Sequence, residues 1–236
     1  MNRNRDFQFT FEDPLTYLPR KPVQEFAKRR VIYHPQQPSE RLYVVILGRV
    51  KITSVSEDGE QLVARIVGPE GLFGESSMVG RGRNEFAVAL DNVTLMAWTC
   101  TEIETQIERE PRLGLALSQY VVRQCLELQD RIESMAVYKT PERVMLSLLQ
   151  LAASLGMALP DGTIRVPALT HHTIAEYVGT SREIVTFQLN RLRREGMLRY
   201  SRKFLDIDPA AISAELRSLG VSLPHVPAAP LMRAAG

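Results

Sequence analysis

Hydrophobic positions in the first half of the chain follow the pattern of short β-strands. Four segments between Val31 and Trp98 are rich in Val, Ile and aromatic residues, and turn signals separate them: RVIYH, RLYVVILGRVKITSV, QLVARIVG and EFAVALDNVTLMAW. Asp58-Gly59, between two of these segments, is a hairpin signal. Many short strands with regular turns predict an antiparallel barrel or roll. We assign it to residues 21–109, after an N-terminal lead of residues 1–20.

The pattern changes to helical spacing after the last of these strands. Thr101 to Arg109 predicts a short helix, and Pro111 opens a long one that runs to about Val137. Within the long helix, apolar residues recur at four-three-four-three spacing at Val121, Cys125, Leu128, Ile132 and Met135. This is the spacing of a coiled-coil seam, so residues 110–137 are expected to form a dimerisation helix. Because the seam covers only about two heptads, a helix packed into the core of one chain is the alternative.

The remaining residues predict a second domain, at 138–220. Thr140 as N-cap and Pro141 at the first helical position begin a helix that ends at Gly156. The segment TIRVPAL follows as a short strand. Pro and Ala dominate residues 221–236, which we expect to form a disordered tail.

Within this second domain, the segment from Leu169 to Leu198 has the pattern of a helix-turn-helix. Ala175 is a small residue where two helices would cross, and Gly179, four residues later, supplies a turn with positive φ. An apolar seam at helical spacing is formed by Ile174, Val178, Val185, Leu189 and Leu192. The segment MLRYSRKFLDI then predicts the hairpin of a winged helix. The alternative is an ordinary helical hairpin in a protein core.

Positive charge is concentrated at this motif. The whole chain carries a net charge of +2, whereas Ser181 to Lys203 contains seven basic and two acidic residues, a net +5 that leaves −3 for the remainder. Neutralising DNA phosphates requires such a local patch. A helix face that is merely solvated would carry more interleaved acidic residues.

The sequence argues against a metal site and against a membrane-spanning segment. Cys100 and Cys125 are too few and too far apart for a zinc site or a cysteine-held iron–sulfur cluster, and the histidines lack metal-ligand spacing, so no metal or haem is expected. His171-His172 is interpreted as a polar surface pair. No apolar run could span a bilayer, and the N-terminus lacks the apolar stretch of a signal peptide. These features favour a cytoplasmic protein with free thiols and no membrane partner.

The order of a strand-rich roll, a long helix and a winged helix-turn-helix resembles the CRP/FNR superfamily of bacterial transcription factors. The resemblance covers about Val31 to Asp208, and its marks are Glu40 to Gly48 (ERLYVVILG), Asp58-Gly59, Gly71-Leu72-Phe73-Gly74-Glu75 and Thr180 to Leu198. It implies an α+β fold and a homodimer on a palindromic double-stranded DNA site. RNA polymerase is the further partner that it implies, and enzymatic activity is not expected.

The segment Gly71-x-x-Gly74-Glu75 is similar to the phosphate-binding cassette of cyclic-nucleotide domains. There, the cassette continues to an arginine, a small hydroxyl residue and an alanine, whereas the matching triplet here is Glu85-Phe86-Ala87. A carboxylate would repel the phosphate that an arginine binds, so the effector is unknown and cyclic AMP is not expected. Arg81 and Arg83 either bind another anion or solvate the loop. The resemblance assigns the effector pocket to Gly74, Glu75, Ser76, Arg83, Glu85, Phe86, Gln124 and Leu128.

The resemblance also assigns the recognition helix. Arg182 and Glu183 match an Arg and a Glu of the family motif, and are expected to contact guanine and cytosine edges. Phe187 replaces a second Arg, and it either packs on a thymine methyl group or turns inward against the wing. Helical spacing adds the remaining base-reading candidates, Thr186 and Asn190. Glu183 has a second interpretation, as part of a capping box with Thr180. The expected phosphate contacts are Ser181, Arg191, Arg193, Arg194, Arg202 and Lys203.

Three functions are compatible with these patterns. The first is a homodimeric, sequence-specific DNA-binding transcription regulator whose roll senses a small molecule. The second is a constitutive DNA-binding factor whose roll is only structural. The third is a cyclic-nucleotide regulatory subunit of an enzyme, although the chain lacks kinase, P-loop and nucleophile-elbow motifs.

Overall fold

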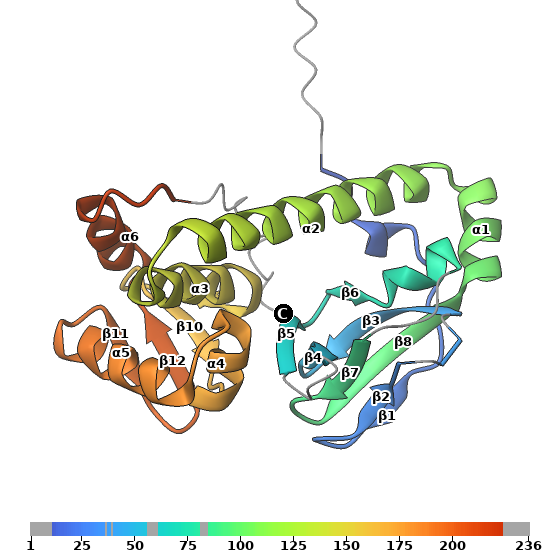
Figure 1. The fold of residues 1–236 in the computed structure, drawn as a ribbon. Coiled ribbons are helices and arrows are strands. Elements are labelled where there is room, and N and C mark those ends of the chain that lie inside the picture. The colour runs from blue at the N-terminus through green and yellow to red at the C-terminus, as the bar shows by residue number, and fades with distance from the viewer. Residues whose placement is uncertain (1–10, 36, 39, 56–60, 81–84, 224–236) are drawn as a thin grey trace, which may run out of the picture.

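The computed structural model describes residues 11–35, 37–38, 40–55, 61–80 and 85–223. A roll of β-strands and a C-terminal helical domain lie on the same side of one long helix, α2, which joins them (Figure 1). None of the helices in these ranges is long and apolar enough to cross a membrane.

The roll consists of two four-stranded antiparallel sheets that share one core. The first sheet has the strand order β1 (Gln24–Phe26), β8 (Val93–Thr99), β3 (Arg41–Leu47) and β6 (Leu72–Phe73). The second has the order β2 (Val31–Tyr33), β7 (Glu85–Ala89), β4 (Val50–Val55) and β5 (Gln61–Val67). Val45 and Leu95 of the first sheet pack with Val50 and Ala87 of the second. The predicted antiparallel roll is confirmed. Asp58-Gly59 lies outside the described residues.

Helices α1 (Cys100–Arg109) and α2 (Arg112–Val137) follow the last strand, close to the predicted bounds. The N-terminal half of α2 covers the outer face of the first sheet, where Leu113 and Leu117 pack with Leu42 and Trp98. The C-terminal half continues past the roll and reaches the second domain (Figure 1).

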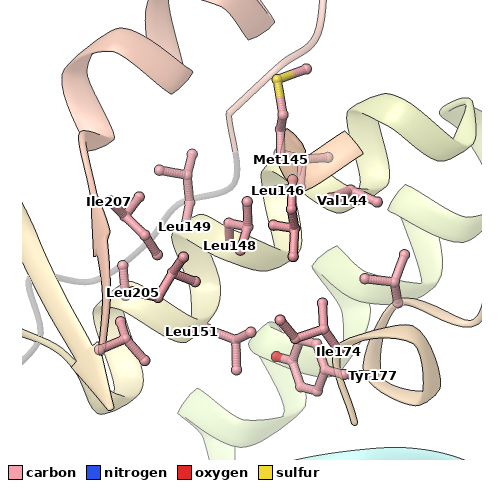
Figure 2. Close-up of a cluster of buried hydrophobic side chains, with 14 of the residues drawn as sticks. Val144, Met145, Leu146, Leu148, Leu149, Leu151, Ile174, Tyr177, Leu205 and Ile207 are labelled. Atoms are coloured by element: carbon pink, nitrogen blue, oxygen red, sulfur yellow. The ribbon is translucent and has the colours of Figure 1, made fainter. Parts of the chain in front are cut away.

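The C-terminal domain is a winged helix-turn-helix, as predicted. Its helices are α3 (Thr140–Leu155), α4 (His171–Val178), α5 (Arg182–Arg194) and α6 (Pro209–Ser218). Its strands are β9 (Met157–Ala158), β10 (Ile164–Pro167), β11 (Leu198–Tyr200) and β12 (Phe204–Ile207), in the sheet order β11-β12-β10-β9. Buried side chains of α3, including Leu148 and Leu151, meet Ile174 of α4 and Ile207 of β12 in the core (Figure 2).

Two local predictions were wrong. The N-cap of α3 is Lys139, and Thr140 is already helical, because the Glu142 carboxylate accepts the Lys139 backbone N–H at 2.6 Å and so fixes the helix start one residue earlier. Val221, which we assigned to a disordered tail, is only 5% exposed and belongs to the C-terminal core. The Val221 backbone N–H donates to the Leu216 carbonyl at 3.0 Å, which holds Val221 against the end of α6 and places its side chain in the core. Residues 224–236 of the expected tail lie outside the described residues.

The roll also packs directly against the C-terminal domain, through β4, β5 and α4. Val63 and Ile66 of β5 are buried in the same hydrophobic cluster as Ile174 of α4. Lys51 of β4 forms an ion pair with Glu176 of α4, with Nζ 2.9 Å from Oε2. The helix-turn-helix is therefore held by the roll as well as by its own core.

Candidate nucleic-acid interface

The turn between α4 and α5 is built by a glycine and a serine. Gly179 adopts φ of +72°, which favours glycine, and the backbone N–H groups of Gly179 and Thr180 donate to the Ala175 carbonyl. Ser181 then caps α5, since its Oγ accepts the Ile184 N–H at 3.4 Å. The predicted cap, Thr180, was wrong by one residue, because two adjacent hydroxyl residues can both cap and only one has the right geometry.

The seam that holds the two helices together is buried as predicted. Ala175 and Val178 of α4 and Val185, Leu189 and Leu192 of α5 are all buried in the domain core. This packing fixes which face of α5 points outward.

The outward face of α5 carries Arg182, Glu183, Phe187 and Asn190, all of which are exposed. Phe187 is 62% exposed, so the interpretation that it turns inward against the wing was wrong. Ile184, one turn before Phe187, is 40% exposed and extends the apolar surface. The sequence did not single out Ile184, although its i, i+3 spacing to Phe187 could have done so.

The Glu183 carboxylate accepts hydrogen bonds from its own backbone N–H and from the Ser181 hydroxyl. These bonds hold the pKa of Glu183 below its ordinary value. The carboxylate therefore stays ionised and is able to accept a hydrogen bond at neutral pH.

Thr186, which we predicted as a base-reading residue, is engaged within the protein. Its Oγ1 donates to the Arg182 carbonyl at 2.8 Å and lies 2.7 Å from Nδ1 of His171. Because the hydroxyl has one proton, the His171 Nδ1–H is the donor in the second bond. Burial, with a smaller effect of the Arg182 charge, lowers the pKa of His171 and favours this neutral form. His171 therefore ties the start of α4 to α5 and is more than a surface residue.

The wing supplies the second side of this surface. The ring of Tyr200, on β11, lies 5.5 Å from the His171 ring, centroid to centroid. Arg202 and Lys203, between β11 and β12, are exposed. Arg165 of β10 pairs with Asp206 through two hydrogen bonds, and so stiffens the sheet beneath the wing.

The predicted phosphate-binding cations differ in their surroundings. Arg193 and Arg194 are exposed near the end of α5. Arg191 is half-buried, with Nε 3.6 Å from the Glu195 carboxylate and a guanidinium nitrogen 3.9 Å from the Met145 sulfur. The exposed cations therefore lie near the C-terminal end of α5 and in the wing, and Arg191 is less exposed than they are.

In the roll, two of the predicted effector-pocket residues, Glu75 and Gln124, bond to an arginine that the sequence did not single out. Gly74 has φ of +87° and precedes the short 3₁₀ helix η2 (Glu75–Val79); a Cβ there would lie 2.8 Å from the Arg41 carbonyl oxygen, so only glycine fits. Arg65 of β5 donates to Glu75 at 2.7 Å and to Gln124 of α2 at 2.5 Å. The cassette carboxylate is thus already paired with a cation.

The other pocket candidates are more dispersed. Glu85 accepts a hydrogen bond from the Tyr33 hydroxyl at 2.7 Å. Ser76 and Phe86 are half-buried, and Leu128 is exposed on α2. Arg83 lies outside the described residues.

The apolar seam of α2 faces solvent in the single chain. All five of its members are exposed: Val121, Cys125, Leu128, Ile132 and Met135. The interpretation that this seam packs into the core of one chain was therefore wrong. The opposite face of the helix makes the contacts with the roll.

Comparison with known proteins gives the family. Residues 23–110 match the cyclic nucleotide-binding domain model, and residues 142–214 match the Crp-like helix-turn-helix domain model. The chain is 31% identical to the global nitrogen regulator of Synechocystis sp., over 82% of this chain and 88% of the relative. It is 33% identical to the transcriptional regulator SdrP of Thermus thermophilus, over 83% of this chain and 95% of the relative.

A solved structure gives the same result. A CRP/FNR-family transcriptional regulator from Thermus thermophilus is 30% identical, with a TM-score of 0.66, over 82% of this chain and 97% of that one. The chain belongs to the CRP/FNR superfamily of DNA-binding transcriptional regulators, whose members are transcription factors and not enzymes.

The exposure of Phe187 leads to a prediction. Phe187→Ala should change the free energy of unfolding by less than about 0.5 kcal/mol, because the side chain buries little in the free protein. If Phe187 packs on a thymine methyl group, wild type should bind its site more tightly than the same site with uracil at that position, and Phe187→Ala should remove the difference. Equal binding of wild type to thymine and uracil at every half-site position would contradict the contact.

Proposed function

We propose that the protein is a homodimeric transcription regulator that binds a palindromic DNA site through α5. The observation that carries this proposal is the outward face of α5. Arg182, Phe187 and Asn190 are exposed there, and the cations Arg193 and Arg194 flank them. A helix of this kind fits the major groove, where arginine binds guanine bidentately and apolar groups contact the thymine methyl. DNA as the target implies action in the bacterial cytoplasm, with RNA polymerase as the expected partner.

The exposed seam of α2 supports the homodimer. Leu128 and Ile132 are 49% and 68% exposed in the single chain, and they lie at seam positions of a two-heptad repeat. Exposed apolar residues at this regular spacing are best explained by a second copy of α2. A parallel pair of such helices would set the two recognition helices about 34 Å apart, one turn of DNA.

The effector pocket does not fit cyclic AMP. Glu85 stands where the resemblance expects a phosphate-binding arginine, and it already accepts a hydrogen bond from Tyr33. The resemblance implies that Glu75, as the glutamate of the cassette, would bind the ribose hydroxyl, but Glu75 is paired with Arg65. A cyclic phosphate would therefore meet a carboxylate, and the ribose hydroxyl would compete with an ion pair.

The Arg65–Glu75 pair also favours the second candidate function, a constitutive regulator. Arg65 bridges the cassette to Gln124 of α2 through the protein's own side chains. A metabolite that raises the thermal stability of the protein would favour the sensing regulator over the constitutive one, because a ligand specific for the folded state stabilises it.

Two matched arginine variants test DNA recognition. Arg182→Ala should weaken binding to the specific site by about 1–3 kcal/mol and relax the preference at one G·C pair in each half-site. Arg193→Ala should weaken binding to all sequences alike and reduce the salt dependence, because a phosphate contact carries no sequence information. Binding of both variants to specific and random DNA would be measured by fluorescence anisotropy. A uniform loss for Arg182→Ala would refute its assignment as a base-reading residue.

The dimer is tested by a charge in the seam. Leu128→Glu would place two carboxylates against each other at the interface, so analytical ultracentrifugation should show monomers. Gln129→Glu is the control, since it adds the same charge to the same exposed turn of α2 but lies outside the seam. An unchanged dimer affinity for Leu128→Glu would remove the support for this interface.

Cyclic AMP should neither bind in the micromolar range by calorimetry nor change the affinity for DNA. The reason is the carboxylate of Glu85 in the place of the phosphate-binding arginine. A micromolar dissociation constant would show that another residue binds the phosphate.

A further inference from the structure

Arg131, on the C-terminal half of α2, lies where the roll, the long helix and the helix-turn-helix meet. Its guanidinium donates to the Val63 carbonyl at 2.7 Å, to the Ala64 carbonyl, and to the Tyr177 carbonyl at 2.6 Å. The first two carbonyls belong to β5, and the third belongs to α4. The guanidinium carbon also lies 4.4 Å from the centroid of the Tyr177 ring. One side chain therefore holds three structural elements together.

The chemistry of the junction is specific to arginine. A planar guanidinium has five N–H donors in a fixed arrangement, whereas a lysine ammonium is a compact point charge. Tyr177 is in the last turn of α4, where carbonyl groups lack partners within the helix and carry partial negative charge. A cation there satisfies the carbonyl and also stacks on the aromatic ring.

The same stretch of β5 is tied to α2 a second time. Arg65 directly follows Ala64 on β5, and its guanidinium donates to Gln124 of α2. Gln124 lies seven residues before Arg131, on the same face of α2. The two arginines thus fix β5 to the long helix at two points. Of these two arginines, Arg131 is the one that also donates to the helix-turn-helix.

We infer that Arg131 is a positioning residue for DNA recognition, which sets the place of each recognition helix relative to the dimer helix. The inference rests on the proposed function, a dimer on a palindromic site. Since α4 packs on α5 through the buried seam, fixing the end of α4 to α2 and β5 also fixes α5. Without this contact each helix-turn-helix would still recognise its own half-site. The distance between the two would vary more, because the packing of β5 on α4 and the Lys51–Glu176 pair would then join α4 to the roll without Arg131. Fixing that distance on DNA would cost free energy and weaken binding to the full site.

The test compares Arg131→Gln with Arg143→Gln. Arg143 is the matched control: it is on α3, and its guanidinium donates to the Gly179 carbonyl at 3.0 Å, at the same end of α4. Both variants lose one positive charge and one bond at that helix end, but the Arg143 bond stays within the C-terminal domain. Dissociation constants would be measured by fluorescence anisotropy for the natural palindrome, for the same palindrome with two base pairs inserted between the half-sites, and for a single half-site.

Wild type should lose about tenfold or more in affinity on the two-base-pair insertion, because half-site spacing is fixed by the dimer geometry. Arg131→Gln should bind the natural palindrome about tenfold more weakly, the scale of losing hydrogen bonds to a charged group, and the loss on insertion should shrink to about threefold or less. Its half-site affinity should match that of Arg143→Gln. Arg143→Gln should keep the spacing preference of wild type.

A spacing preference in Arg131→Gln equal to that of wild type would overturn the positioning role and leave the proposed function intact. Tighter binding of Arg131→Gln to the palindrome would overturn it as well, since the contact would then restrain DNA binding. A wild-type protein with no spacing preference would overturn both proposals. Circular dichroism melting would show whether Arg131→Gln is folded. If Arg131→Gln is unfolded, Arg131→Lys would be used in its place, because lysine keeps the charge but not the planar donors. The same reduced spacing preference is expected for Arg131→Lys.

Discussion

The apolar seam between α4 and α5 is the constraint on which the functional surface depends. Ala175 allows the two helices to approach closely, and Val185 and Leu189 are buried against α4. Because these positions are fixed by helical spacing, the opposite face of α5 has to be exposed, with Arg182 and Phe187 on it. The bond from His171 to Thr186 and the packing of β5 against α4 then act on an arrangement that the seam has already set.

The parts of the structure that follow from local rules could be predicted from the sequence. The strands of the roll, the long helix and the helix-turn-helix have hydrophobic periodicities of two or about 3.6 residues, and Gly179 marks the turn by its positive φ. Small errors occurred where two neighbouring residues compete for one role. Thr180 and Ser181 both make good N-caps, and the outcome depends on whether Ser181 has extended or helical backbone angles, which no sequence pattern records; here it is extended.

Contacts between distant segments could not be predicted, because most of them end on groups without a sequence signature. Arg131 donates to three backbone carbonyls, and every residue has a carbonyl. Arg65 pairs with Glu75 ten residues away and with Gln124 on another element, and nothing in the spacing of these residues distinguishes them from solvated ones. Thr186 has the helical phase of a base-reading residue, yet its hydroxyl is used by His171 and by the Arg182 carbonyl.

Contacts within the protein also change how much positive charge is available to bind DNA. Seven basic residues occur between Ser181 and Lys203, but Arg191 lies against Glu195, and Arg199, although exposed, is paired with Asp161 at 2.7 Å. Hydrogen bonds from Thr163 and from Arg199 together hold the pKa of the Asp161 carboxyl below its ordinary value. The other five are exposed: Arg182, Arg193, Arg194, Arg202 and Lys203. Under the proposed function Arg182 reads a base and the other four cations neutralise phosphates. Because each neutralised phosphate releases counterions, these four would set the scale of the salt dependence for each chain. These four lie at the end of α5 and in the wing, and only Arg182 lies at the start of the helix. In the proposed complex, most of the electrostatic attraction would therefore act at the C-terminal end of α5 and in the wing. Phe187 and Asn190, between these cations and Arg182, would make contacts that depend on the base sequence.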